Sequence, residues 1–420
     1  MGFWTVLEVA SMSMVQVLII TILGALMATD YLGLLQTDAR RSLNKIVFMV
    51  FTPALLFASL ADTVTLQDII TWWYMPVNIG LIFLIGGILG WILVKVLKLE
   101  PHLEGLVIAT CSAGNMGNIF VIFIPAICKE DGSPFGNHNI CESTGLSYAS
   151  FSMALGFFYI WTSTYLVMRS SALKYKALKA TEDVSKMPNK DLNANGKTHL
   201  LEGEFKKHVT TLSSSIKSAG EDAENQAIVS LVSTSKLGME PASIQGKLNA
   251  IFHPILELLL EPPTVGAIVG FIFGATPWLK NLVIGDTAPL RVIQDSAKVL
   301  GDGTIPCITL ILGGNLTGIG KARIKPLVII ATLCVRYIIL PTIGIGVIQA
   351  ATKFGFLPSD PLYHFMLMVQ YTLPPAMNIS TIAQLFDVGQ EECSILMLWT
   401  YLCAAPALTV WSTVYLSILF

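Results

Sequence analysis

Two helix-breaking stretches lie inside long apolar runs of this chain: Ser112-Ala113-Gly114-Asn115-Met116-Gly117-Asn118 and Leu373-Pro374-Pro375-Ala376-Met377-Asn378. The runs extend over about 104–127 and 362–386, so each could cross the ~30 Å hydrocarbon core as a helix. Proline lacks an N–H and glycine weakens a helix, so both helices are predicted to break near their centres. Broken backbone at membrane depth is tolerated only where protein or a water-filled cavity covers it. The two breaks are therefore predicted to face each other.

The rest of the chain is also apolar. Its 420 residues are 53% hydrophobic and 13% charged, with a mean hydropathy of +0.66, whereas soluble domains are about 25% charged. Apolar runs of this length must be helical in lipid, because every backbone N–H and C=O needs an internal partner. The sequence predicts an all-α membrane protein with ten transmembrane helices. We expect them at about 9–29, 42–61, 72–97, 104–127, 146–168, 248–275, 294–316, 326–351, 362–386 and 393–419.

The order of these helices predicts three regions. Residues 1–168 form a first five-helix repeat, 169–246 a polar, mostly disordered loop, and 247–420 a second five-helix repeat. Because each half holds an odd number of helices, the second must be inverted relative to the first. Pro53 and Pro306 each follow a lysine by eight residues and precede the breaks in the same order. We therefore predict an inverted repeat, the usual plan of secondary transporters.

Basic residues in the short loops predict the orientation. Arg40, Arg41 and Lys95 belong to loops on the same side as the central loop, which is therefore predicted to be cytosolic, with both termini on the other side. The loop before the last helix is an exception, since its charged residues are acidic. Cys128 and Cys141 bracket a loop on the non-cytosolic side, where a disulfide is allowed. The sequence leaves their pairing open.

The two breaks are the predicted substrate site. Helix N-termini and freed N–H groups favour an anion, and Asn amides can donate to a carboxylate. The predicted substrate-binding residues are Asn115, Met116, Gly117, Asn118, Pro374, Pro375, Met377, Asn378, Pro53 and Pro306. The last two are expected either to line the site or only to kink their helices.

Ionisable residues within membrane spans are candidates for function. Glu261 or Asp302 could carry a coupling proton, and Arg336 could attract an anion or pair with one of these acids. The alternative is a structural ion pair or an interfacial side chain. No nucleotide-binding loop, metal-ligand cluster, basic patch or catalytic Ser/His arrangement appears in the sequence. We therefore expect no enzyme activity, no metal, no cofactor and no nucleic acid partner.

Several segments together carry a family resemblance: Phe51-Thr52-Pro53-Ala54-Leu55-Leu56, residues 112–118, Glu261-Pro262-Pro263-Thr264, Gly301-Asp302-Gly303-Thr304-Ile305-Pro306, Gly313-Gly314-Asn315-Leu316, Arg336-Tyr337 and residues 374–378. The sequence resembles the PIN-LIKES family of plant auxin carriers, distant relatives of the PIN-FORMED efflux carriers. The resemblance implies carriers of the endoplasmic reticulum membrane that sequester indole-3-acetic acid and so dampen auxin signalling. It also implies a scaffold of helices 1, 2, 6 and 7, and a moving domain of helices 3–5 and 8–10. The efflux carriers have a single proline in helix 9 where this chain has Pro374 and Pro375.

These observations lead to one main hypothesis and two alternatives. The main one is an elevator-type carrier that moves indole-3-acetic acid and similar anions across the endoplasmic reticulum membrane, with both termini lumenal. The first alternative is a receptor or scaffold that binds the same ligand without moving it. The second is a sodium-coupled carrier of another organic acid. The sequence leaves a homodimer open.

Overall fold

The structure is a computed structural model that describes residues 3–63, 65–117, 120, 123–124, 127–128, 133–185, 260–285, 287–317 and 324–420. The chain divides into two compact units, Met1–Ser171 with His253–Phe420, and Ala172–Phe252. Of the second unit, the structure describes Ala172–Ser185, which are helical. Within these ranges the chain is all-helical, and its one β-type feature is an isolated bridge between Gly114 and Pro375.

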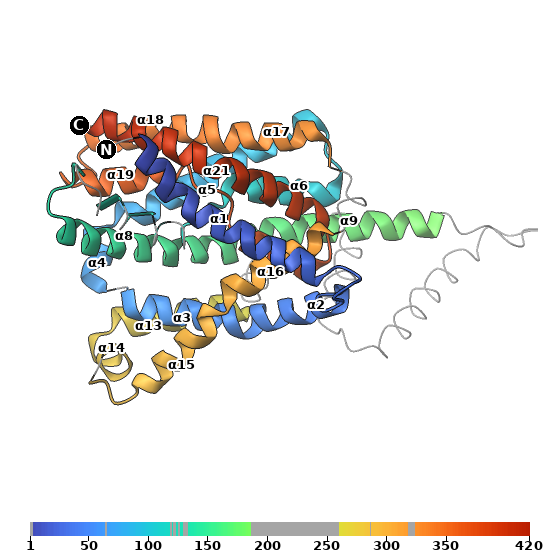
Figure 1. The fold of residues 1–420 in the computed structure, drawn as a ribbon, viewed down its shortest axis with the longest axis horizontal. Coiled ribbons are helices and arrows are strands. Elements are labelled where there is room, and N and C mark those ends of the chain that lie inside the picture. Colours follow the sequence, from blue (N-terminus) through green and yellow to red (C-terminus); the bar gives the residue numbers. More distant parts are fainter. Residues whose placement is uncertain are drawn as a thin grey trace, which may run out of the picture. The chain divides into compact units, whose positions relative to one another are not determined.

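The helices of the first half are drawn from blue to green in Figure 1. They are α1 (Phe3–Met27), α2 (Thr37–Ile46), the π-helical turn η1 (Val47–Phe51), α3 (Thr52–Thr63), α4 (Leu66–Thr71), α5 (Tyr74–Leu97), α6 (Pro101–Ser112), α8 (His138–Tyr159), the π-helical turn η2 (Ile160–Thr164) and α9 (Tyr165–Ser185).

The helices of the second half are drawn from yellow to red in Figure 1. They are α13 (Pro262–Ala275), α14 (Pro277–Val283), α15 (Arg291–Asp302), α16 (Thr304–Leu316), α17 (Pro326–Cys334), the π-helical turn η4 (Val335–Ile339), α18 (Leu340–Lys353), α19 (Pro361–Val369), α20 (Asn378–Phe386) and α21 (Gln390–Leu419).

Each of the ten predicted segments contains helix in its described part, but fewer of them are long enough to cross a membrane. Six described helices meet that length and hydropathy, or seven if α13 and α14, which meet at 106°, count as one span. Three segments are not among these spans. In segment one only Val15–Met27 counts as an apolar helix, which is too short, and segments four and nine fall short because α6, α19 and α20 are only 12, 9 and 9 residues long. Ten spans and the inverted relation stay predictions.

Prolines and glycines set the helix irregularities. Pro53 and Pro341 each lie just after a π-helical turn, η1 and η4, because a proline cannot donate the regular backbone hydrogen bond. Pro306 follows the break at Gly303 between α15 and α16. Pro53 itself packs against α13, where a Cβ on Gly266 would lie 2.6 Å from the Pro53 carbonyl oxygen.

One helix extends beyond its predicted end. We expected helix five to stop at residue 168, but α9 continues to Ser185. The reason lies in residues 172–180, where alanine, leucine and lysine, all strong helix formers, are frequent. The remainder of the predicted 169–246 loop lies outside the described residues.

Contacts between loops fix which helix ends lie together. A guanidinium nitrogen of Arg41 lies 2.9 Å from a carboxylate oxygen of Asp387, so the acidic loop before α21 lies beside the basic residues that open α2.

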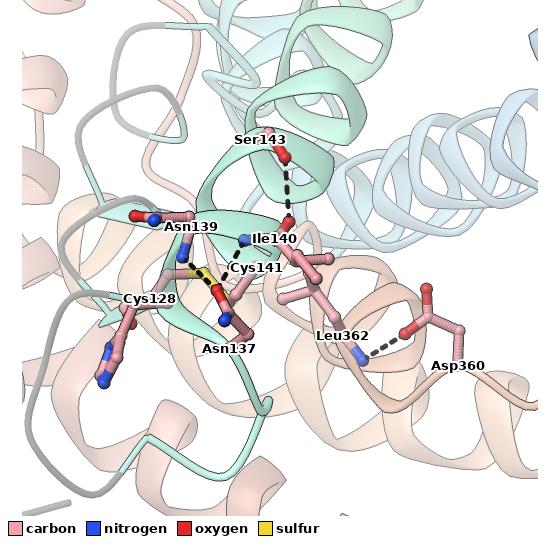
Figure 2. Close-up of a disulfide and its surroundings, with 9 residues drawn as sticks. Cys128, Asn137, Asn139, Ile140, Cys141, Ser143, Asp360 and Leu362 are labelled. Atoms are coloured by element: carbon pink, nitrogen blue, oxygen red, sulfur yellow. Dashed lines mark hydrogen bonds between the residues drawn. A yellow bond between two sulfur atoms is a disulfide. The ribbon is translucent and has the colours of Figure 1, made fainter.

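At the start of α8, Cys128 and Cys141 form a disulfide (Figure 2). In the same view Asn137 caps α8 by accepting hydrogen bonds from the N–H groups of Asn139 and Ile140.

Candidate substrate site at two broken helices

The two interrupted segments lie directly against each other. Asn115 N–H donates to the Pro374 carbonyl at 2.7 Å, and Ala376 N–H donates to the Ala113 carbonyl at 2.9 Å. This short antiparallel pairing, centred on Gly114 and Pro375, gives partners to backbone groups that the helix breaks release. The predicted facing of the two breaks is confirmed.

The side chain of Arg336 stabilises the two paired segments through hydrogen bonds to their backbone carbonyls. This side chain is fully buried and comes from η4. Nε donates to the Leu373 carbonyl at 2.7 Å, Nη1 to the carbonyls of Cys111 (3.0 Å) and Ser112 (3.4 Å), and Nη2 to that of Pro374 (3.4 Å). Cys111 and Ser112 end α6, so the cation sits at the negative end of that helix dipole. In the described ranges its hydrogen-bond partners are carbonyls, and neither Glu261 nor Asp302 is among them.

Gly114 allows this close approach. A Cβ at Gly114 would lie 2.6 Å from Nη2 of Arg336, whose position is held by the four carbonyls. Any larger residue would therefore displace either the guanidinium or the paired backbone.

The Asn115 side chain is held in place by its neighbours. Its Nδ2 donates to the hydroxyl of Tyr401 at 2.7 Å, and that hydroxyl donates to the Pro375 carbonyl at 3.0 Å. Its Oδ1 accepts from Gly117 N–H at 3.3 Å. Asn115 thus ties the first break to both α21 and the second break.

Asn378 differs from Asn115. It begins α20 and is only 6% exposed, yet its Nδ2 has no hydrogen-bond partner. A buried, unpaired amide costs about 1–3 kcal/mol. A group of this kind at a helix N-terminus is suited to donating to an anion.

Asn115 and Asn378 line the same small cavity. Its walls come from the two breaks and from α8 and η2: Asn115, Met116, Gly117, Met153, Gly156, Phe157, Ile160, Ala376 and Asn378. The volume is about 10 Å³, room for about one water molecule. Organic ligands occupy pockets of roughly 300–1,000 Å³, so this conformation is closed around the site.

A buried polar network supports the second break. Asn78 Nδ2 donates to Gln370 Oε1 at 2.8 Å and to the Leu367 carbonyl at 3.2 Å. Gln370 Nε2 donates to Ser152 Oγ at 2.8 Å, and Tyr371 OH donates to Asn78 Oδ1 at 3.1 Å. The end of α19 is therefore fastened to α5 and α8.

The other predicted site residues lie around or away from this cavity. The Met377 sulfur accepts from the hydroxyl of Thr309 at 3.5 Å, while Pro53 and Pro306 do not line the cavity. Glu261 precedes α13 and accepts from Tyr165 OH at 2.6 Å. Asp302 is exposed at the end of α15. Asn118 lies outside the described residues.

Several cavity residues were not predicted. Met153, Gly156, Phe157 and Ile160 come from apolar stretches with no distinguishing pattern. Tyr401 does not line the cavity but bonds to Asn115, and it had one signal in the sequence: a hydroxyl in the middle of an apolar helix, which needs a polar partner when buried. In the described ranges, no group of three or more His, Cys, Asp or Glu side chains could hold a metal ion.

Comparisons with known proteins cover nearly the whole chain. A family model described as "Membrane transport protein" matches residues 9–412. Among curated proteins of Arabidopsis thaliana, the chain is 57% identical to Protein PIN-LIKES 7 over 420 residues and 55% identical to Protein PIN-LIKES 5 over 421 residues. Both alignments cover 100% of this chain and 100% of the relative. It is 40% identical to Protein PIN-LIKES 3 over 408 residues, 97% of this chain and 96% of that protein.

Proposed function

We propose, because this chain belongs to the membrane transport protein family and to its PIN-LIKES group, that it carries indole-3-acetic acid and similar weak acid anions across the endoplasmic reticulum membrane. The family is one of transporters, so the chain is a multi-pass membrane transporter and not an enzyme. The observation that carries the substrate proposal is the unpaired Asn378 amide beside the oriented Asn115 amide in a closed cavity.

The chemistry of the cavity suits a carboxylate attached to an apolar group. Asn378 supplies a free amide donor at the N-terminus of α20, where the helix dipole favours an anion. Met116, Met153 and Phe157 supply apolar surface for a ring. A weak acid with a carboxyl group is ionised at cytosolic pH, and its anion crosses lipid poorly, so it needs a carrier.

Packing between helices supports an elevator mechanism. In the proposed scaffold, α3 packs against α13 and α15, and α1 packs against α16, which it crosses in Figure 1. In the proposed moving domain, α5 packs against α6 and α8, and α19 against α21. The moving domain would slide against α1, α2 and α16, which also contact it, and would carry the cavity along, because all of the lining residues lie in that domain.

Two contacts support the proposed topology, with a cytosolic central loop and lumenal termini. The Arg41–Asp387 ion pair lies where both loops are proposed to be cytosolic, which accounts for the acidic exception in the charge pattern. The Cys128–Cys141 disulfide lies in the loop proposed to be lumenal, an oxidising compartment.

Uptake into proteoliposomes tests the function directly. We expect the purified protein to accumulate labelled indole-3-acetic acid, with competition by unlabelled weak indole acids and no dependence on sodium. Empty liposomes are the control. Binding without any uptake under proton or sodium gradients would replace the carrier with a receptor. Uptake that requires sodium and ignores indole acids would favour the sodium-coupled alternative.

The Arg41–Asp387 pair should hold the conformation seen here, because it joins the proposed scaffold to the loop between α20 and α21. Asp387→Asn should change the uptake rate by up to about fivefold, since an exposed pair contributes no more than ~1 kcal/mol. Asn also tolerates the left-handed backbone at this position, where φ is +55°.

A matched pair provides the control for this prediction. Arg291 and Asp295 are almost equally exposed, 48% and 57% against 47% and 56%, but they lie within one helix, α15. Asp295→Asn should therefore leave uptake unchanged. Arg41→Gln breaks the same pair and should change the uptake rate as Asp387→Asn does. Equal effects of the two Asp→Asn variants would contradict a role for the Arg41–Asp387 pair.

A further inference from the structure

A second cavity lies on α5, shares no lining residue with the closed substrate cavity, and has a volume of about 490 Å³. Its surface is almost entirely apolar, and it is open along one side. The lining residues come from α5, α6 and the α8–η2–α9 helix: Gly80, Phe83, Leu84, Gly87, Ile88, Trp91, Ile108, Ser112, Tyr159, Ser163, Thr164 and Val167. We call this cavity the α5 groove.

The α5 groove has the length of one membrane leaflet. Its α5 residues follow one face of the helix from Gly80 to Trp91, which at 1.5 Å per residue is about 16 Å. Half of the ~30 Å hydrocarbon core is about 15 Å. Leu84, Ile88 and Trp91 on its rim are about half exposed, at 58%, 49% and 53%, so the groove opens onto a surface that faces lipid in a membrane.

Positive charge lies at one end of the α5 groove. Lys95, one turn beyond Trp91, places its ammonium group 5.9 Å from the centre of the Trp91 ring. Lys98 ends the helix in a left-handed conformation, with φ of +48°. Both lysine side chains are exposed. A tryptophan and lysines at the end of a span are the arrangement that meets lipid headgroups.

Glycine keeps the middle of the α5 groove open. A Cβ added to Gly87 would meet no atom within 4 Å, whereas a Cβ on neighbouring Gly86 or Gly90 would clash with α6. The groove is therefore open for an acyl chain along its apolar length.

We propose that the α5 groove binds one acyl chain of an anionic phospholipid, with the phosphate-bearing headgroup at Lys95 and Lys98. The proposal goes beyond the transport function and does not depend on which solute is carried. The apolar stripe selects a hydrocarbon chain, its length selects a single leaflet, and the two lysines select a negative headgroup.

Native mass spectrometry of the purified full chain tests this binding. Phosphatidylserine and phosphatidylcholine with identical acyl chains are titrated in turn. We expect wild type to retain clearly more phosphatidylserine than phosphatidylcholine. Gly87→Leu fills the groove and should reduce retention of both lipids about tenfold. Gly346→Leu is the matched control, because a Cβ there also meets nothing within 4 Å on an exposed helix face; it should bind like wild type.

Headgroup recognition is tested separately by Lys95→Gln combined with Lys98→Gln. These side chains are exposed, so the variant should fold, keep phosphatidylcholine binding and lose the preference for phosphatidylserine. The proposal would be overturned if Gly87→Leu retained as much lipid as wild type, or if wild type bound the two lipids equally. So would displacement of bound lipid by indole-3-acetic acid together with loss of that acid's binding in Gly87→Leu, since the groove would then be a substrate site.

Discussion

Replacing Arg336 with methionine should sharply reduce the yield of folded protein and lower its melting temperature by several degrees or more. The guanidinium donates to carbonyls in both broken segments, at 2.7 Å to Leu373 and 3.0 Å to Cys111. Methionine fills similar space but leaves these carbonyls buried and unsatisfied, at about 1–3 kcal/mol each. Thermal unfolding in detergent, followed by size-exclusion chromatography, measures the loss.

Arg336→Lys separates geometry from charge. Lysine keeps the positive charge, but its single ammonium cannot span carbonyls in two segments as the planar guanidinium does. We expect a stability between those of wild type and Arg336→Met. Lys353→Met removes an exposed cation from the same long helix and should melt like wild type. An Arg336→Met protein as stable as wild type would show that the four carbonyl contacts contribute little.

The second large effect is expected at Asn378. Asn378→Ala should reduce the affinity for indole-3-acetic acid roughly 10–150-fold, because a hydrogen bond to a charged group contributes about 1.5–3 kcal/mol. Its stability should equal or exceed that of wild type, because the substitution removes an amide with no partner in the closed state. Binding of labelled acid and thermal unfolding of the same preparation give the two values.

Two other asparagines supply the comparison. Asn115→Ala should lose both affinity and stability, since Asn115 also bonds to Tyr401 and to Gly117. Asn315→Ala should lose stability alone, because its amide donates to Gln384 at 3.3 Å and does not line the cavity. A less stable Asn378→Ala protein that binds the acid normally would make Asn378 a packing residue and move the substrate site elsewhere.

The sequence by itself determined the class of the protein and the place of its two breaks. In lipid, a long apolar run of this kind forms a helix, because its backbone groups must find partners within the run. Proline and glycine then weaken or interrupt that helix. Both properties depend on residues close together in the chain, so α6 ends at Ser112 and α20 begins after Pro374 and Pro375, as their local composition predicts. The resemblance to the PIN-LIKES family rested on the same local segments.

Only the tertiary structure decided what the polar groups at the breaks do. Arg336 was a candidate for pairing with an acid, yet it binds the carbonyls of Leu373 and of Cys111, 225 positions away. Asn115 and Asn378 looked equivalent in sequence, but Tyr401, 286 positions from Asn115, pairs with the first and leaves the second unpaired. The physical reason is that a hydrogen bond requires a partner within about 3 Å in a suitable direction. For these side chains, packing between distant helices sets both distance and direction.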